Sequence, residues 1–223
     1  MLGIKSQHYA DADHCIASKH LRKIGILGGT FNPPHYAHLE MARDIYREFG
    51  LEQVVLLPCG DPPHKRKEQV ANKFHRYNML CLLIKDIPFL SVSDVEIMRK
   101  GFTYTVDTMQ ILQEKYLHKA RLYYIIGTDT LLTLESWRDY QRVFSMTSFI
   151  CVMRPGDSPL QVKKKIEYFQ KQYHLDIQLA DSVGLNISST MVREKFLRGE
   201  DITAYTSKEI EEYMKNNDVY ERE

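Results

Sequence analysis

The sequence predicts an α/β protein, a single doubly wound Rossmann-like domain with a mainly parallel sheet and a C-terminal helical segment. Three observations lead to this class. Short apolar runs alternate with amphipathic segments, short loops join them, and the runs LYYIIG (122–127) and SFICVM (148–153) are apolar throughout. Continuous apolar runs are typical of strands buried on both faces. Strands that alternate with helices form parallel sheets.

The expected elements follow in a regular order. We predict strands at 24–27, 53–57, 89–93, 122–127, 148–153 and 177–180. Apolar residues at helical spacing predict helices at 39–49, 74–85, 104–116, 136–144, 158–173, 189–198 and 207–216. Gly50 follows the first of these helices, where a glycine commonly ends a helix. Residues 1–22 are mixed polar without a clear period, so we expect an N-terminal extension before a domain at 23–223.

Composition excludes several classes of protein. The 223 residues are 43% hydrophobic, enough for the core of one domain, and the net charge of +1 gives no reason to expect a nucleic-acid partner. The four cysteines are far apart and form no C-x-x-C pair, so a disulfide framework is not expected. The chain has no apolar stretch of the roughly 20 residues that a membrane span needs and no signal-peptide pattern. We therefore expect a cytoplasmic protein without a membrane partner.

The loop after the first strand, GGTFNPPHYAH (28–38), is the most informative segment. Gly28 and Gly29 lack a side chain, so a ligand can approach the backbone closely. His35 and His38 are three residues apart at a helix start, where exposed N–H groups and the helix dipole favour phosphate. One alternative is a proline-rich turn with two incidental histidines. A zinc site is another, although it lacks a nearby carboxylate or thiolate.

Two further loops follow strands and offer polar groups. GDPPHKRK contains Lys65, whose place after a strand is compatible with a role in a ligand site, or which belongs to a solvated charge run. GTDT contains Gly127, which permits close approach of a ligand, and Asp129. Asp129 could accept hydrogen bonds from ribose hydroxyls or cap the next helix.

The last strand leads into NISSTMVR, a helix start rich in hydroxyl groups. Ser188 and Thr190 can cap the helix, and Arg193 lies about one turn further on. This pattern is a second phosphate site, or else an ordinary cap with a surface arginine. Because both loops follow parallel strands, they lie at the same edge of the sheet. Together they suggest a nucleotide whose phosphoryl chain is cut.

GFTYTVDT (101–108) and the single tryptophan complete the candidate site. Tyr104 and Thr105 open a predicted helix, whose unpaired N–H groups favour an anion such as a carboxylate. Trp137 offers an aromatic face for stacking. The alternative is that Thr105 is a plain cap and Trp137 a core residue.

The first and last of these motifs, His35-Tyr36-Ala37-His38 and ISSTMVR (187–193), resemble those of the nucleotidyltransferase superfamily. Ala37 stands where that superfamily usually has glycine. The additional segments PPHK, YTVDT and GTD make the chain similar to bacterial nicotinate-nucleotide adenylyltransferases over about residues 23–220.

This resemblance implies transfer of the adenylyl group of ATP to nicotinate mononucleotide, giving nicotinate adenine dinucleotide and pyrophosphate in NAD biosynthesis. It implies ATP and nicotinate mononucleotide as partners and Mg²⁺ as the cofactor that accompanies ATP. The catalytic residues would be His35, His38 and Arg193. ATP would be bound by Gly28, Gly29, Thr30, Phe31, His35, His38, Ile187, Ser188, Thr190 and Arg193, and the acceptor substrate by Lys65, Tyr104, Thr105, Gly127, Asp129 and Trp137.

Other functions remain open at this point. Another adenylyltransferase or a cytidylyltransferase of the superfamily would share the first and last motifs. A nucleotide-binding sensor without catalysis is a second alternative, and a metal hydrolase built on His35, His38, His64 and His75 is a third. The sequence leaves the oligomeric state open and is compatible with a homo-oligomer.

Overall fold

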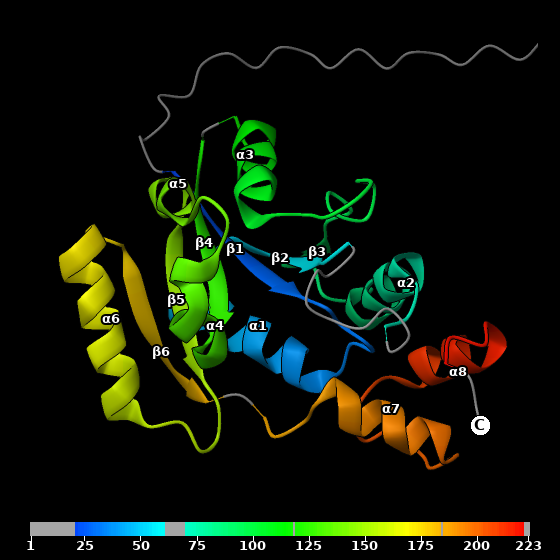
Figure 1. Cartoon of the computed structure of the whole chain (residues 1–223). Coiled ribbons are helices and arrows are strands. Elements are labelled where there is room, and N and C mark those ends of the chain that lie inside the picture. Colours follow the sequence, from blue (N-terminus) through cyan, green and yellow to red (C-terminus); the bar gives the residue numbers. More distant parts are fainter. Residues whose placement is uncertain (1–20, 61–69, 118, 184, 221–223) are drawn as a thin grey trace, which may run out of the picture.

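The computed structural model of the chain describes residues 21–60, 70–117, 119–183 and 185–220. These residues form one six-stranded parallel sheet between two layers of helices (Figure 1), which confirms the predicted fold class. The strands are β1 (Arg22–Gly29), β2 (Gln53–Pro58), β3 (Leu90–Val92), β4 (Ala120–Gly127), β5 (Ser148–Met153) and β6 (Ile177–Val183). The helices are α1 (Tyr36–Glu48), α2 (Lys73–Ile84), α3 (Thr105–Lys115), α4 (Thr128–Thr133), the 3-10 turn η2 (Leu134–Ser136), α5 (Tyr140–Met146), α6 (Pro159–Tyr173), α7 (Ser189–Leu197) and α8 (Lys208–Asn216).

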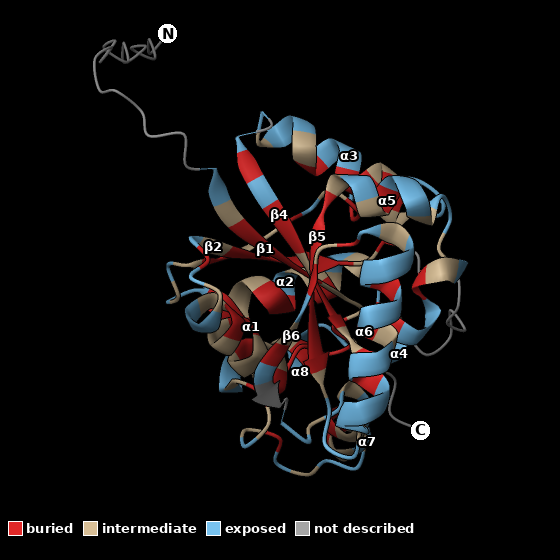
Figure 2. Cartoon of the chain, turned by 90° about the vertical axis from the view of Figure 1, so that its left-hand side faces the viewer, coloured by how far each residue is buried: buried red, intermediate tan, exposed pale blue. Residues whose placement is uncertain are grey.

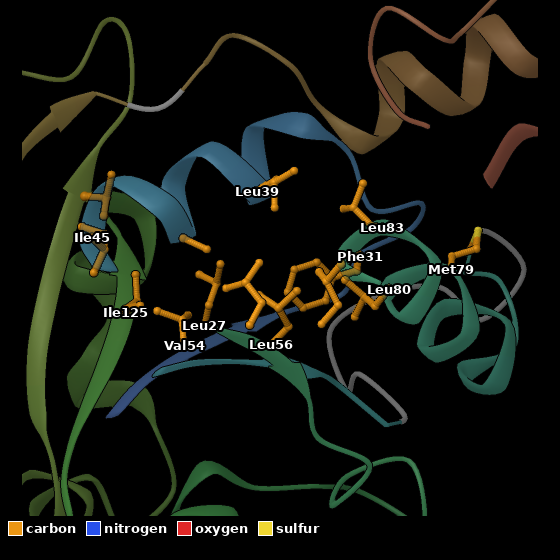
Figure 3. Close-up of a cluster of buried hydrophobic side chains, with 14 of the residues drawn as sticks. Leu27, Phe31, Leu39, Ile45, Val54, Leu56, Met79, Leu80, Leu83 and Ile125 are labelled. Carbon is orange, nitrogen blue, oxygen red and sulfur yellow. The ribbon is translucent and has the colours of Figure 1, made fainter. Parts of the chain in front are cut away.

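Each face of the sheet carries its own hydrophobic cluster. Ile24 and Ile26 of β1 pack with α3, α4, α5 and α6, whereas Leu27 packs on the other face with α1, α2, α7 and α8. Figure 2 shows the central parts of the strands buried and the outer faces of the helices exposed. Figure 3 shows the second cluster, in which sheet residues such as Leu56 lie between the side chains of α1 and α2. Burial on both faces explains why the strands read as continuous apolar runs.

The order of the strands determines where a ligand can bind. The sheet runs β3-β2-β1-β4-β5-β6, so the chain winds outward from β1 to β3 and then returns to β4 on the other side of β1. The loops that leave β1 and β4 therefore turn to opposite faces. In doubly wound sheets the crevice outside the carboxyl ends of such a strand pair is the usual ligand site.

Several predicted boundaries differ from the structure, most clearly around Trp137. The predicted helix at 136–144 is divided: η2 ends at Ser136, Trp137 is extended, and α5 begins only at Tyr140. Asp139 breaks the helix because its backbone is left-handed, with φ 52°, a conformation that aspartate tolerates better than most residues. The first strand also begins two residues before its predicted start, since Arg22 of β1 pairs with Ala120 of β4. No helix in the described part of the chain is long and apolar enough to cross a membrane.

Gly25 of β1 has no room for a side chain, and this gives a test of the packing. A Cβ there would lie 2.8 Å from Leu51 Cδ1 and 3.2 Å from Ile125 Cδ1. We expect Gly25→Ala to lower the free energy of unfolding by about 1–3 kcal/mol through overpacking, as measured by urea denaturation. Gly127→Ala is the matched control, because its Cβ would meet nothing closer than 3.7 Å. Equal stability of the two variants would show that the core around β1 is loosely packed.

Candidate active site

A cavity of about 680 Å³ opens at the carboxyl ends of β1 and β4. Its size is typical of a small-molecule site. The predicted residues that line it are Gly28, Gly29, Thr30, Phe31, His35, His38, Gly127, Trp137, Ile187, Ser188 and Thr190. The structure thus brings the first and last motifs of the chain to one cavity, as the sequence predicted.

The loop between β1 and α1 is held by hydrogen bonds from side chains of distant elements. This loop contains two prolines and forms no ladder of its own, so its carbonyls need other donors. Thr30 O accepts from Arg76 Nη1 (2.8 Å), Asn32 O from Arg193 Nη1 (2.9 Å), Pro33 O from Ser189 Oγ (2.9 Å) and Pro34 O from Thr206 Oγ1 (3.0 Å). Elements α2 and α7 and the segment before α8 therefore fix this loop jointly.

The two histidines form a stacked pair at the start of α1. Their ring centroids are 3.8 Å apart, and the backbone N–H of His35 donates to His38 Nδ1 at 3.2 Å. Burial lowers the pKa of His35 to about 4, and burial together with the neighbouring His35 lowers the pKa of His38 well below its usual value. Both rings are therefore neutral near pH 7. Because His38 Nδ1 is an acceptor, the neutral ring carries its proton on Nε2 and can donate from that atom.

The second helix start at the cavity is that of α7. Ser188 is its N-cap, and Ser188 Oγ accepts from the backbone N–H of Met191 at 3.2 Å. Ser188 and Thr190 line the cavity. Arg193 does not belong to the cavity lining; its guanidinium points to the carbonyl of Asn32. A contact between Arg193 and phosphate stays a prediction.

Tyr104 and Thr105 lie beside the cavity and outside its lining. Tyr104 is the N-cap residue of α3, and the guanidinium of Arg138 lies 4.5 Å from its ring centroid. Thr105 forms a hydrogen bond with Tyr124, whose pKa burial raises well above its usual value. Tyr124 and Trp137 both line the cavity, and their ring centroids are 5.7 Å apart at a steep angle. Tyr124 thus connects the start of α3 to the cavity wall.

Of the remaining predicted residues, one lines the cavity, one is exposed and one lies outside the described residues. Gly127 is the N-cap of α4 and lines the cavity. Asp129 is exposed and forms an ion pair with Arg154 (Oδ2 to Nη1, 2.6 Å). The N-cap of α4 is Gly127, and Asp129 lies in the first turn of that helix. Lys65 lies outside the described residues.

Sequence reasoning missed Arg154 and Arg76. Arg154 lines the cavity and directly follows β5, so the rule that ligands bind at the carboxyl ends of strands could have identified it. Arg76 lies within α2, and no pattern in the sequence distinguishes it from a surface arginine.

The described residues do not form a metal centre of their own. No group of three or more His, Cys, Asp or Glu side chains among them lies close enough to hold a metal ion. The lining of the cavity, as far as the structure describes it, contains no carboxylate. His75, proposed above as a metal ligand, instead pairs with the hydroxyl of Tyr213 at 3.0 Å.

In this doubly wound domain, the N-termini of two helices meet at a cavity where the strand order reverses. This arrangement is typical of nucleotide-binding proteins. The model of the cytidylyltransferase-like family matches residues 26–195. A curated relative from Thermoanaerobacter sp. (strain X514), named a probable nicotinate-nucleotide adenylyltransferase, is 36% identical over 201 residues, covering 90% of this chain and 95% of the relative. A relative of the same name from Desulfitobacterium hafniense (strain Y51) is 38% identical over 199 residues, covering 89% and 96%. The chain therefore belongs to the cytidylyltransferase-like family and, within it, to the nicotinate-nucleotide adenylyltransferases.

Solved structures agree with this fold. The nicotinic acid mononucleotide adenylyltransferase of Plasmodium falciparum, complexed with NaAD, superposes with a TM-score of 0.72 at 20% identity and covers 91% of this chain and 98% of its own. The same enzyme complexed with APC superposes with a TM-score of 0.69 at 20% identity, with the same coverage of both chains.

The buried histidine pair gives a prediction for stability against pH. Since the pKa of His35 falls from 6.5 to about 4 on folding, the unfolded chain binds more protons between these values. The contribution of His35 to the free energy of unfolding is therefore fully present above pH 6.5 and is lost as the pH falls towards 4. We expect the free energy of unfolding to drop by roughly 2 kcal/mol between pH 7 and 5 on account of His35. Urea denaturation at both pH values measures it.

His35→Gln is the control, because glutamine does not titrate. Its free energy of unfolding is expected to depend less steeply on pH than that of the wild type. Identical pH dependence of the two proteins would contradict a buried, neutral His35.

Proposed function

We propose that this protein transfers the adenylyl group of ATP to nicotinate mononucleotide, with nicotinate adenine dinucleotide and pyrophosphate as products. The observation that carries the proposal is the convergence of two helix starts, α1 and α7, on one cavity at the sheet's switch point. Each supplies a positive dipole end for a polyphosphate. The activity named for the relatives supports the same reaction. We assign this reaction to the cytoplasm and to NAD biosynthesis.

The reaction needs no nucleophile from the protein. A phosphate oxygen of the acceptor attacks the α-phosphorus of ATP, the new O–P bond forms, and the bond to the β-phosphate breaks as pyrophosphate leaves. Catalysis then consists of holding the two substrates in line and stabilising the charge on the transferring and leaving groups. His38 suits the second task, because its neutral ring donates from Nε2 without adding a charge to the site.

The residues predicted to bind substrates, within the cavity lining and outside it, divide into two groups under this proposal. His35, His38, Ser188, Thr190 and Arg193 serve the triphosphate, with Gly28, Gly29, Thr30, Phe31 and Ile187 lining the nucleotide. Lys65, Tyr104, Thr105, Gly127, Asp129 and Trp137 serve the acceptor, with Lys65 at its phosphate and Asp129 at a ribose. Arg154, which lines the same cavity, adds a cation close to Gly127.

Mg²⁺ fits this site only as an ion that enters bound to the phosphates of ATP. Without a carboxylate in the described lining, phosphate oxygens and water would be its ligands. The ion would neutralise charge on the leaving pyrophosphate. The protein's own part is to hold the triphosphate with the groups at α1 and α7.

His38→Ala tests the catalytic assignment. Loss of one preorganised donor to a developing charge typically lowers kcat by about 10²–10³-fold, and we expect a loss of this size with the fold intact by circular dichroism. His75→Ala is the matched control, because His75 bonds to Tyr213 and does not line the cavity. Turnover of His38→Ala close to that of His75→Ala would limit His38 to a structural role.

The acceptor itself is tested by comparing kcat/KM for nicotinate mononucleotide and nicotinamide mononucleotide at fixed ATP and Mg²⁺. We expect the acid to be preferred, because the start of α3 at Tyr104 and Thr105 favours a carboxylate. The amide would turn an NH₂ group towards donors and leave them unpaired, which can reduce kcat/KM by orders of magnitude. Equal values, or a preference for the amide, would overturn this assignment.

A further inference from the structure

Arg76 of α2 is a buried cation whose hydrogen bonds reach several loops. It is 1% exposed. Its Nε donates to Ala71 O (3.0 Å), its Nη1 to Thr30 O (2.8 Å), and its Nη2 to Cys59 O (2.7 Å) and Gly60 O (2.8 Å). One guanidinium therefore holds the loop after β1 and the residues after β2 at a fixed separation. The planar fork of arginine makes this possible, and an ammonium group could not reproduce it.

Glu96 is a buried carboxylate with a comparable set of contacts on the acceptor side. It is 7% exposed. Its Oε2 accepts from Thr103 Oγ1 (2.9 Å) and its Oε1 from Thr108 Oγ1 (2.8 Å), so it holds both sides of the start of α3. Its Oε2 also accepts from the backbone N–H of Gly60 at 3.4 Å.

Gly60 is the point at which these two sets of contacts meet. Its carbonyl accepts from Arg76 and its N–H donates to Glu96. A Cβ at this position would lie 2.5 Å from the carbonyl oxygen of Glu96, so only glycine fits without displacing the backbone. We call the chain of contacts Thr30–Arg76–Gly60–Glu96–Thr103 the Gly60 bridge.

We propose that Arg76 and Glu96 are positioning residues, and that the Gly60 bridge sets the distance between the ATP loop at Thr30 and the acceptor-binding start of α3. This inference rests on the proposed function, which assigns ATP to the first loop and the acceptor to Tyr104 and Thr105. Neither Arg76 nor Glu96 belongs to the described lining of the cavity. They act through the two loops that they connect.

The bridge has a distinctive kinetic consequence. Each substrate meets its own loop, and the loop after β1 keeps its other contacts when the bridge is lost, because Arg193, Ser189 and Thr206 still hold its remaining carbonyls. In-line attack, however, requires the two substrates at a defined separation, and a misplacement of about 1 Å can lower the rate by about 10²-fold. A defect in the bridge therefore appears in kcat and much less in KM.

The test uses Arg76→Lys, Glu96→Asp and Gly60→Ala in the full chain, assayed with ATP, Mg²⁺ and nicotinate mononucleotide. We expect kcat to fall about tenfold or more in each variant, with both KM values within about threefold of wild type. The double variant Arg76→Lys/Glu96→Asp is expected to lose little beyond the worse single variant, since both changes break one bridge. Circular dichroism and thermal unfolding establish that the assayed protein is folded.

Thr147→Val is the matched control for a loss of stability alone. Thr147 is buried, and its hydroxyl donates to Leu122 O at 2.8 Å, at the edge of the sheet opposite the cavity. We expect this variant to lose stability and to keep its kcat. Bridge variants that keep kcat, or that change KM instead of kcat, would overturn the inference while the wild type remains active. A wild type without turnover would contradict the proposed function itself.

Discussion

The candidate site depends on how the proline-rich loop after β1 satisfies its carbonyls. An unpaired buried carbonyl costs roughly 1–3 kcal/mol, and this loop has no neighbouring strand to pair with. Side chains from α2, from α7 and from the segment before α8 supply the donors instead. The ISSTMVR motif therefore has two tasks. Ser188 and Thr190 face the cavity, while Ser189 and Arg193 hold the loop opposite them.

The electrostatics of the cavity follow from the same arrangement. Because burial keeps His35 and His38 neutral, the positive potential for an anion comes mainly from the starts of α1 and α7, and Arg154 adds a charge that its ion pair with Asp129 partly offsets. Helix dipoles are fixed by the backbone and need no reorganisation when charge develops. Neutral imidazoles add directed donors to this field. The described lining has no carboxylate to oppose it.

The sequence predicted most strands to within one or two residues, because burial on both faces makes their apolar runs continuous. It also predicted the convergence of the two motifs, because loops after parallel strands share one edge of the sheet. It could not predict the break at Asp139, which depends on a left-handed backbone at a residue that also occurs in helices. The role of Arg76 could not be predicted either, because its acceptor Thr30 O is 46 residues away in the sequence. Local periodicity carries no information about contacts at that separation.

The strand order explains why such long-range contacts are needed. β1 lies between β2 and β4, so the segments after β2 and β3 approach the cavity from one side and those after β4, β5 and β6 from the other. On the proposed assignment, the start of α3 comes from the first side and the start of α7 from the second. Neighbouring strands fix the sheet but leave the loops beyond it free to shift. Two substrates that must meet in line therefore require contacts between loops, and buried, charged hydrogen-bonding groups such as Arg76 and Glu96 provide them with the least freedom of movement.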